Sequence, residues 1–417
     1  MKKWVVTGLF TAISFTQTVA HADWQWSGFA TAAGAASNVK FLNPNVEPLY
    51  VEKIGKQITL ENDSVLGFQV DKMMDDDFSI TGRIVAEGRN DWRVKATRAY
   101  FEYHAADNWF WRAGRMPIDY LIYSAKVNET HAYSWIALPE SVYHVIPFHY
   151  EDAISTGAKF EFFDRVLNIS GAYGSLTEET ETPVTNIELK YKLRQVASLM
   201  ASFGDEIFKV HASYHVGRLT WAPNAQNVMV NNFINNTLVP QGFMGLDQQN
   251  YLTVDNARMS YSSIGYTFDW KRMISGAEFL RRKSSSAIIP DINAWYVMLG
   301  CRYHELIPYV TFARQRIMDN DTRRFSGLAN TAAMAANGLG NTLDRTVQNI
   351  AEGIDGPAAG DQTSITVGVR WNITKLISIK GSYQHIHPDR YGSGLFNVHP
   401  HRSVNIWRAG IDGEFFA

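Results

Sequence analysis

Histidines gather in two parts of the sequence, and they are the residues best suited to bind a metal. One group lies within Pro117–Tyr150 and the other lies near the C-terminus. Their members are His131, His144, His149, His385, His387, His399 and His401. Four imidazoles can bind zinc, but these have no fixed spacing, and Cys301 is the single cysteine. Serines and histidines are frequent, yet no motif singles out a nucleophile–His–acid set. We therefore predict no metal site, no cofactor and no enzymatic activity.

The elements that position the polar side chains show a repeated alternation of apolar and polar residues. In one example Phe208, Val210, Ala212, Tyr214 and Val216 alternate with Lys209, His211, Ser213 and His215. A period of two predicts β-strands, and about sixteen segments show it. The predicted strands lie near 24–36, 57–72, 78–89, 93–104, 109–115, 153–162, 166–174, 187–203, 207–217, 258–268, 272–282, 293–303, 309–317, 363–372, 376–385 and 403–415.

The connections between these segments alternate in length. Short connections lie near Met74–Asp77, Ala105–Asn108, Asp164, Gly204–Glu206, Asp269–Lys271, Glu305–Pro308 and Lys375. Long connections lie near Asn38–Lys56, Pro117–Tyr150, Ser175–Asn186, Thr220–Asn256, Met318–Asp361 and His387–Arg402. Short turns at one rim and long loops at the other are typical of a barrel in lipid, where closure removes unpaired sheet edges. We predict an all-β protein, a transmembrane antiparallel β-barrel of about sixteen strands.

The N-terminus has the features of a secretory signal peptide. Lys2 and Lys3 precede the apolar run Trp4–Phe15, and Ala20-His21-Ala22 follows as a cleavage site. We predict a signal peptide at 1–22 and a single barrel domain at 23–417. Loss of the two lysines changes the formal net charge from −2 to about −4, which implies no nucleic-acid partner. The chain is 46% hydrophobic and 13% aromatic, which suits strands that expose half their side chains to lipid.

The last predicted strand carries a family resemblance. Trp407, Ala409, Ile411, Gly413 and Phe415 share one face, and the chain ends Phe415-Phe416-Ala417. This ending resembles that of the outer-membrane porins of Gram-negative bacteria, which close with an alternating strand and an aromatic residue; the additional Ala417 departs from that pattern. In that family the third outer loop folds into the pore and sets its width. Pro117–Tyr150 stands at that position, so the resemblance implies that this loop lines the lumen.

If the apolar faces of the strands contact lipid, the opposite faces line the lumen. The basic residues on those faces are Arg83, Arg98, Arg112, Lys159, Lys190, Lys192, Arg194, Lys209, Arg370, Lys380 and Arg408. The acids on those faces are Glu61, Asp63, Glu87, Glu102, Glu161, Glu188, Asp412 and Glu414. The resemblance implies that Arg83, Arg98, Arg112 and Arg408 form a basic wall opposite an acidic loop. Opposed charges across a narrow lumen create a transverse field that orients dipolar solutes.

The loop supplies the other half of the predicted constriction. The candidates are Glu129 and Glu140 for the acidic side, with Tyr133, Trp135 and Tyr143 shaping the opening. Arg115 stands directly before the loop, either at the constriction or as an anchor of the loop base. The alternative is that the wall arginines only pair with Glu87 and Glu102 and solvate the wall.

These observations predict a channel for passive diffusion of small polar solutes and ions across the outer membrane of a Gram-negative bacterium. The basic excess on the inner faces predicts a mild anion preference. The resemblance further implies contact with outer-membrane lipid and a homotrimer. The first alternative is a substrate-specific channel for a sugar, a peptide or a dicarboxylate. A barrel enzyme, such as a phospholipase or a protease, and an adhesin are the alternatives of other classes.

Overall fold

The computed structural model describes residues 24–39, 54–146, 148–181, 188–221, 236, 254, 256–285, 289, 291–318, 361–389, 395–396 and 402–416. The predicted signal peptide at 1–22 lies outside these residues, and so do His399, His401 and Ala417. None of the helices in the described part of the chain is long and apolar enough to cross a membrane.

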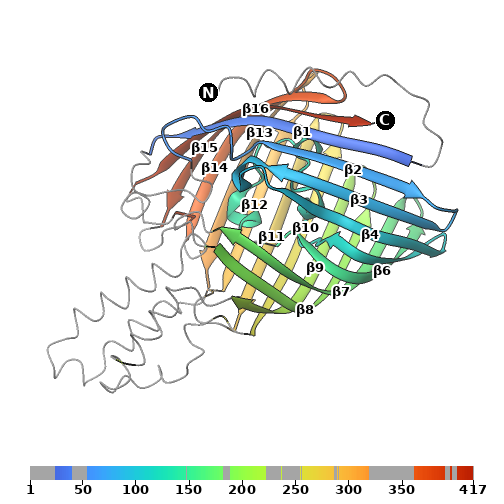
Figure 1. Cartoon of the computed structure of the whole chain (residues 1–417). Helices are drawn as coiled ribbons and strands as arrows, with labels where there is room; N and C mark the ends of the chain where they lie inside the picture. Colours follow the sequence, from blue (N-terminus) through green and yellow to red (C-terminus); the bar gives the residue numbers. More distant parts are fainter. Residues whose placement is uncertain are drawn as a thin grey trace, which may run out of the picture.

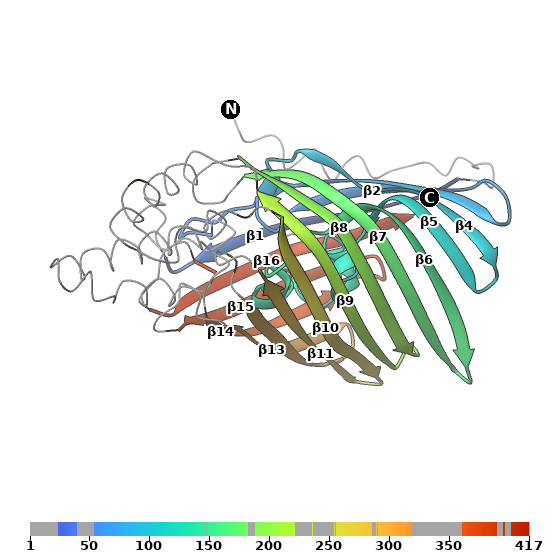
Figure 2. The same cartoon turned by 90° about the horizontal axis from the view of Figure 1, so that it is seen from below.

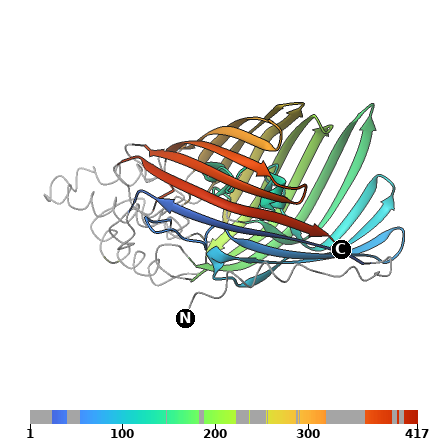
Figure 3. The same ribbon diagram turned by 90° about the horizontal axis from the view of Figure 1, so that it is seen from above.

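Sixteen strands in the described residues form one closed antiparallel barrel, as predicted (Figure 1). Each strand pairs with its neighbours in sequence, and β16 closes the barrel against β1, beside which it lies in Figure 3. The strands are β1 Trp24–Ser37, β2 Val65–Met73, β3 Phe78–Glu87, β4 Val94–Ala106, β5 Trp109–Pro117, β6 Tyr150–Phe162, β7 Arg165–Glu181, β8 Glu188–Gly204, β9 Phe208–Trp221, β10 Ala257–Trp270, β11 Met273–Ser284, β12 Ile292–Cys301, β13 Leu306–Ile317, β14 Gln362–Asn372, β15 Ile377–Pro388 and β16 Val404–Phe416.

The outer surface of the barrel carries a belt of exposed apolar side chains. Strands β2 to β16 each contribute at least one, among them Leu66, Ile84, Phe101, Trp111, Ile154, Tyr173, Leu199, Tyr214, Ile264, Phe279, Val297, Val310, Val367, Tyr383 and Trp407. The residues between them on each strand face inward, because successive side chains of a strand point to opposite faces. A continuous apolar belt is unfavourable in water and suits the hydrocarbon layer of a membrane.

The two rims differ as the sequence predicts. Seven connections of two to four residues join β2 to β3 and the alternate pairs that follow, all at one rim. The opposite rim carries the longer connections, including residues 118–149 between β5 and β6. Four short helical turns occur in the described residues, η1 Gly88–Asn90, η2 Ser124–Lys126, η3 Thr130–Ala132 and α2 Glu140–Tyr143. Three of these four belong to the connection 118–149.

Several details of the sequence prediction are wrong, and one is the end of β7, which lies at Glu181 rather than near residue 174. Strand β2 begins at Val65 rather than near residue 57, and before it Thr59 makes only an isolated bridge to Ala35. In β8, Leu193 is buried and Arg194 is exposed, so Arg194 faces outward rather than into the lumen. Lys192 shares the parity of Arg194 and faces outward too, and the side chain of Lys190 lies outside the described residues. The inward face is apolar here because the loop 118–149 packs against it.

Candidate functional site

The connection 118–149 folds into the barrel instead of extending away from the rim. Its helical turns lie within the ring of strands in Figures 2 and 3. Helix α2 contacts β12, β13 and β14, whereas η3 contacts β16. The base of the loop is closed by a hydrogen bond from the Ile118 amide to the His149 carbonyl at 3.1 Å. The loop therefore reaches across the interior from β5 to the last strands of the chain.

Aromatic side chains of the loop form a packed core with one wall of the barrel. Trp135 is 2% exposed, and its indole N–H donates to the Thr311 hydroxyl on β13 at 2.8 Å. Its ring packs edge-on against Tyr296 of β12, with centroids 5.7 Å apart. Tyr133 and Tyr143 are also buried in this core. The prediction that these three rings shape an opening is therefore wrong, because burying their large apolar area against the wall is more favourable.

Glu278 of β11 connects this core to the loop backbone. Its carboxylate accepts hydrogen bonds from the Ile122 amide at 2.6 Å, the Tyr143 hydroxyl at 2.5 Å and the Tyr296 hydroxyl at 2.8 Å. Burial, together with the charge of Glu278, raises the pKa of Tyr143, so its phenol remains a donor. Gly265 makes room for this approach, since a Cβ there would lie 2.5 Å from Glu278 Cγ. Sequence analysis missed Glu278, whose only signal is an acid at a position in phase with apolar inward residues.

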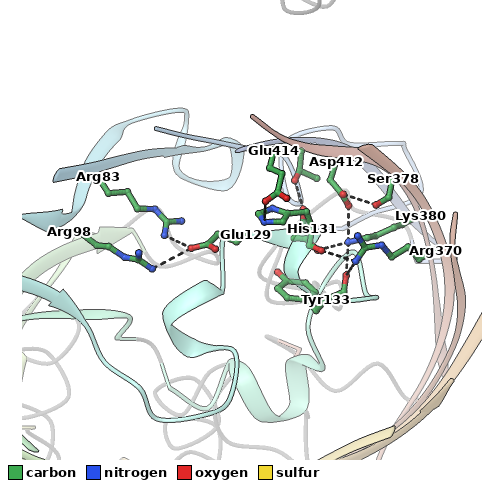
Figure 4. Close-up of polar contacts among 12 residues, drawn as sticks. Arg83, Arg98, Glu129, His131, Tyr133, Arg370, Ser378, Lys380, Asp412 and Glu414 are labelled. Carbon is green, nitrogen blue, oxygen red and sulfur yellow. Dashed lines mark hydrogen bonds and ion pairs between the residues drawn. The ribbon is translucent and has the colours of Figure 1, made fainter. Parts of the chain in front are cut away.

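Glu129 anchors the loop to the wall of β3 and β4. Its Oε1 lies 2.5 Å from Arg83 Nη1 and 3.3 Å from Arg98 Nη2 (Figure 4). Arg98 also donates to the Ala125 carbonyl at 2.8 Å, and the Arg83 guanidinium stacks 4.5 Å from the Phe29 ring centroid. The predicted partners therefore come together, but they are in direct contact and do not face each other across water.

A second anchor lies on β15 and β16. The Lys380 ammonium contacts the carbonyls of Thr130, Tyr133 at 2.8 Å and Trp135 at 3.1 Å, and it pairs with Asp412 at 2.8 Å. Asp412 also accepts from the Ser378 hydroxyl at 2.7 Å (Figure 4). The lysine side chain is 1% exposed. Three of its four acceptors are backbone carbonyls of the loop. This lysine therefore holds the path of the loop backbone and does not only neutralise a carboxylate.

Further polar contacts surround this anchor. Arg370 of β14 donates to the carbonyls of His131 at 2.7 Å and Tyr133 at 3.1 Å. The His131 ring lies 2.5 Å from Glu414 of β16, and burial lowers the pKa of His131 despite that carboxylate (Figure 4). The sequence predicts that Arg370, Lys380, Asp412 and Glu414 face inward, and they do. It does not predict that these residues contact the loop.

The third anchor joins Glu140 of α2 to Arg408 of β16. The two side chains are 2% and 3% exposed and form an ion pair. Arg408 also pairs with Asp63 at 3.1 Å and donates to Gln384 Oε1 at 2.8 Å. Gln384 in turn donates to Glu140 at 2.8 Å. Loss of either partner of a buried ion pair leaves the other charge buried and uncompensated, which is strongly destabilising. This pair therefore holds α2 firmly against β16.

Arg112 and Arg115 lie on opposite faces of β5. Arg112 faces inward and pairs with Glu102, which also contacts His104 at 2.9 Å, as the wall-pairing alternative expects. Arg115 shares the outward face with Ala99 and pairs with Asp152 at 2.8 Å. The prediction of a constriction role for Arg115 is therefore wrong, and it anchors the loop base instead. The reason is the period of two, which separates positions 112 and 115.

Arg112 borders the part of the interior that the loop core does not fill. Its side chain is 36% exposed although it faces inward. Asp119, at the start of the loop, lies within electrostatic reach of Arg112 and Arg98. The loop packs its apolar core against β10 to β13 and leaves β4 and β5 lined by solvated charges. No group of three His, Cys, Asp or Glu side chains in the described residues is placed to hold a metal ion.

No protein-family model matches the chain, and no curated protein matches it. Its architecture matches solved barrels at low sequence identity. The outer membrane channel DcaP of Acinetobacter baumannii superposes with a TM-score of 0.55 at 12% identity, covering 96% of this chain and 100% of that one. The anion-selective porin from Comamonas acidovorans gives 0.54 at 10% identity, with 94% and 98% covered. A trimer form of OmpT, an outer membrane protein of Vibrio cholerae, gives 0.50 at 11% identity, with 94% and 100% covered.

Proposed function

We propose that this chain, which has the fold of the Gram-negative outer-membrane porins, is a water-filled channel for passive diffusion of small polar solutes and ions. The apolar belt supports a location in the outer membrane, in contact with lipid. We place the constriction between the loop and the inward wall of β4 and β5, where Arg98 and Arg112 keep solvated surface. The trimer form of the Vibrio cholerae protein supports a homotrimer for this chain as well.

The observation that carries this proposal is the asymmetry of the interior. On one side, the loop buries apolar side chains against β10 to β13. On the other side, Arg98 and Arg112 face inward and keep solvated surface, with side chains 16% and 36% exposed. Asp119 of the loop supplies an opposed negative charge. A polar strip of mixed charge beside a fixed apolar plug suits diffusion of small polar solutes and excludes large apolar ones.

Conductance across a planar bilayer under a salt gradient tests this function. We expect stable ohmic steps, grouped in threes, with a reversal potential that leans toward anions. Arg112→Gln should shift the reversal potential toward cations, because Glu102 then lacks its cationic partner. Arg314→Gln is the matched control, since it is exposed on the outward face of β13, away from the loop, and should leave selectivity unchanged. Insertion of folded protein without any conductance would refute the channel.

Acidification should increase the anion preference. Burial raises the pKa of the Asp119 carboxyl above its ordinary value, although Arg112 and Arg98 oppose the shift. As the pH falls from about 7 to about 4, Asp119 therefore takes up a proton earlier than an exposed aspartate does. Loss of its negative charge leaves the arginines dominant. The reversal potential of Asp119→Asn should equal the wild-type value at low pH and vary less with pH; an identical pH dependence in both proteins would contradict this assignment.

A substrate-specific channel is the second candidate. Arg98, Arg112 and Asp119 could bind a solute that carries both charges, such as a peptide. Titration of a candidate solute into the bilayer separates the two functions. Conductance block that saturates with solute concentration indicates a specific binding site, whereas flux that rises linearly indicates simple diffusion.

A further inference from the structure

Three arginines occupy one rung of the barrel wall. Arg194 of β8 stands opposite Arg218 of β9, and Arg218 stands opposite Arg258 of β10. Directly opposed residues of antiparallel strands have Cβ atoms about 4.5–5.5 Å apart. All three side chains are exposed, and their buried neighbours Leu193, Leu219 and Ala257 face inward. We call Arg194, Arg218 and Arg258 the arginine rung; it lies on the outer surface of the barrel, at the rim of the long loops.

The arginine rung has no carboxylate partner in the described part of the chain. None of the three guanidinium groups forms an ion pair with a carboxylate of another described residue. By contrast, Arg115 and Arg302, also on or near the outer surface, pair with Asp152 and Asp269. Like charges placed directly opposite each other on a sheet are destabilising. Three of them in one row therefore indicate a site at which an anion is the missing partner.

The backbone forms a hollow at the same place. A cavity of about 140 Å³ is lined by Gln195, Val216, Gly217, Arg218 and Arg258. A water molecule occupies about 30 Å³ in the liquid, so the hollow has room for a phosphate group. Gln195 has a positive φ of 53°, and the pairing of β8 with β9 shifts register between Arg194 and Ala197. This bulge directs Gln195, an additional hydrogen-bond donor, into the hollow between the strands.

The apolar belt begins directly beside the rung. Leu199 of β8 and Tyr214 of β9 stand opposite each other, farther along the strands toward the short turns, and both are exposed on the outward face. Ile264 of β10 continues this apolar surface and is 56% exposed. A ligand that covers both surfaces has a phosphate at one end and hydrocarbon at the other. We propose that the arginine rung binds the phosphate of an anionic lipid headgroup, with the acyl chains lying along β8 to β10.

This proposal depends on the membrane location given above and not on channel activity. Arginine suits it because its planar guanidinium donates two parallel hydrogen bonds to a phosphate. The lipid belongs to the leaflet at the rim of the long loops, where the rung lies.

Native mass spectrometry of the refolded full-length protein tests lipid binding. The protein is released from micelles doped with either phosphatidylglycerol or phosphatidylcholine. We expect the triple variant R194Q/R218Q/R258Q to retain phosphatidylglycerol at least about tenfold more weakly than wild type. R314Q/R316Q is the matched control, because these arginines are also exposed on an outward face, on β13. Heat-modifiable electrophoretic mobility verifies that each barrel is closed.

The result that overturns the proposal is equal retention of phosphatidylglycerol by wild type and the triple variant, or an equal loss in R314Q/R316Q. Unchanged lipid retention with a changed oligomeric state would mean that a second copy of the chain covers the rung, and it would also overturn the proposal. Displacement of the lipid by millimolar inorganic phosphate alone would assign the site to free phosphate instead.

A single substitution gives a second, independent test, because it should shift the thermal midpoint in opposite directions in two environments. Arg218→Gln removes the central charge of the rung. Without an anionic lipid this relieves repulsion, so the thermal midpoint should rise in an uncharged detergent. With phosphatidylglycerol present it removes a phosphate ligand, so the midpoint should fall. A shift of the same sign in both environments would refute the phosphate site.

Discussion

Replacing Lys380 with methionine is expected to release the loop from the barrel wall. The ammonium group has four acceptors, the carbonyls of Thr130, Tyr133 and Trp135 and the carboxylate of Asp412. Methionine leaves all four buried and without this donor. Removing one partner of a buried ion pair costs about 3–5 kcal/mol, and the loop can relieve this cost by leaving the wall, where water then reaches the freed acceptors. The barrel strands keep their own hydrogen bonds, so they should stay folded.

Released loops should be visible in two measurements. Single channels of Lys380→Met should show a larger and noisier conductance than wild type, and a protease added on the loop side should cleave within 118–149. Lys283→Met is the control, because that lysine is exposed on the outward face of β11. In the double variant K380M/D412N the cost should be smaller than the sum of the two single variants, because neither charge is then left alone. Quiet wild-type conductance in Lys380→Met would rule out this anchoring role.

The second large effect is expected at Arg408 and Glu140. Arg408→Ala removes the arginine that pairs with the Glu140 carboxylate, which is 2% exposed, and it also leaves Asp63 and Gln384 without this donor. A loss of about 3–5 kcal/mol is expected in the free energy of urea unfolding from lipid vesicles. Glu140→Gln should cost less, since an amide still accepts from Arg408 and from Gln384.

A comparison among the anchors sharpens this prediction. Glu129 is 16% exposed and shares its charge between Arg83 and Arg98. Water compensates part of its loss and Gln can still accept from the arginines, so Glu129→Gln should cost less than Arg408→Ala, although the buried Arg83 then lacks its carboxylate. Arg408→Ala is therefore expected to lower the free energy of unfolding more than Glu129→Gln does. The reverse order would show that exposure does not govern the strength of these anchors.

The sequence predicts the barrel well because strand alternation is a local property. The faces of Ser213 and His215, for example, follow directly from the period of two, and both are buried inward. The prediction fails at Leu193 and Arg194 because it assumes that the lumen is lined by polar groups. Where the loop fills the lumen, an inward face is apolar, and a bulge after Arg194 adds a change of register. Neither the filling nor the bulge is encoded in the local pattern.

The site is predicted in part for a related reason. The sequence indicates which charges face inward, and Arg83, Arg98, Glu129, Glu140 and Arg408 all prove to lie at the loop–wall contact. It does not indicate which of them touch, because Glu140 and Arg408 are separated by 268 positions. The partners of Lys380 are backbone carbonyls, which every residue has and which leave no compositional signal. Trp135 was expected at an opening because an aromatic residue suits either an edge or a core.

The contacts of the loop also constrain the order in which the molecule assembles. The loop follows β5, yet two of its three anchors, Lys380 and Arg408, belong to β15 and β16. Closing so long a stretch of chain is slow, because its entropy cost precedes any reward from contacts. An emerging barrel that lacks its last two strands cannot form these two anchors, so the Thr130, Tyr133 and Trp135 carbonyls and the Glu140 carboxylate lack these cationic partners until β15 and β16 are in place. Full docking of the loop therefore requires the last two strands of the barrel, so the loop reaches its final position only after the strands are complete.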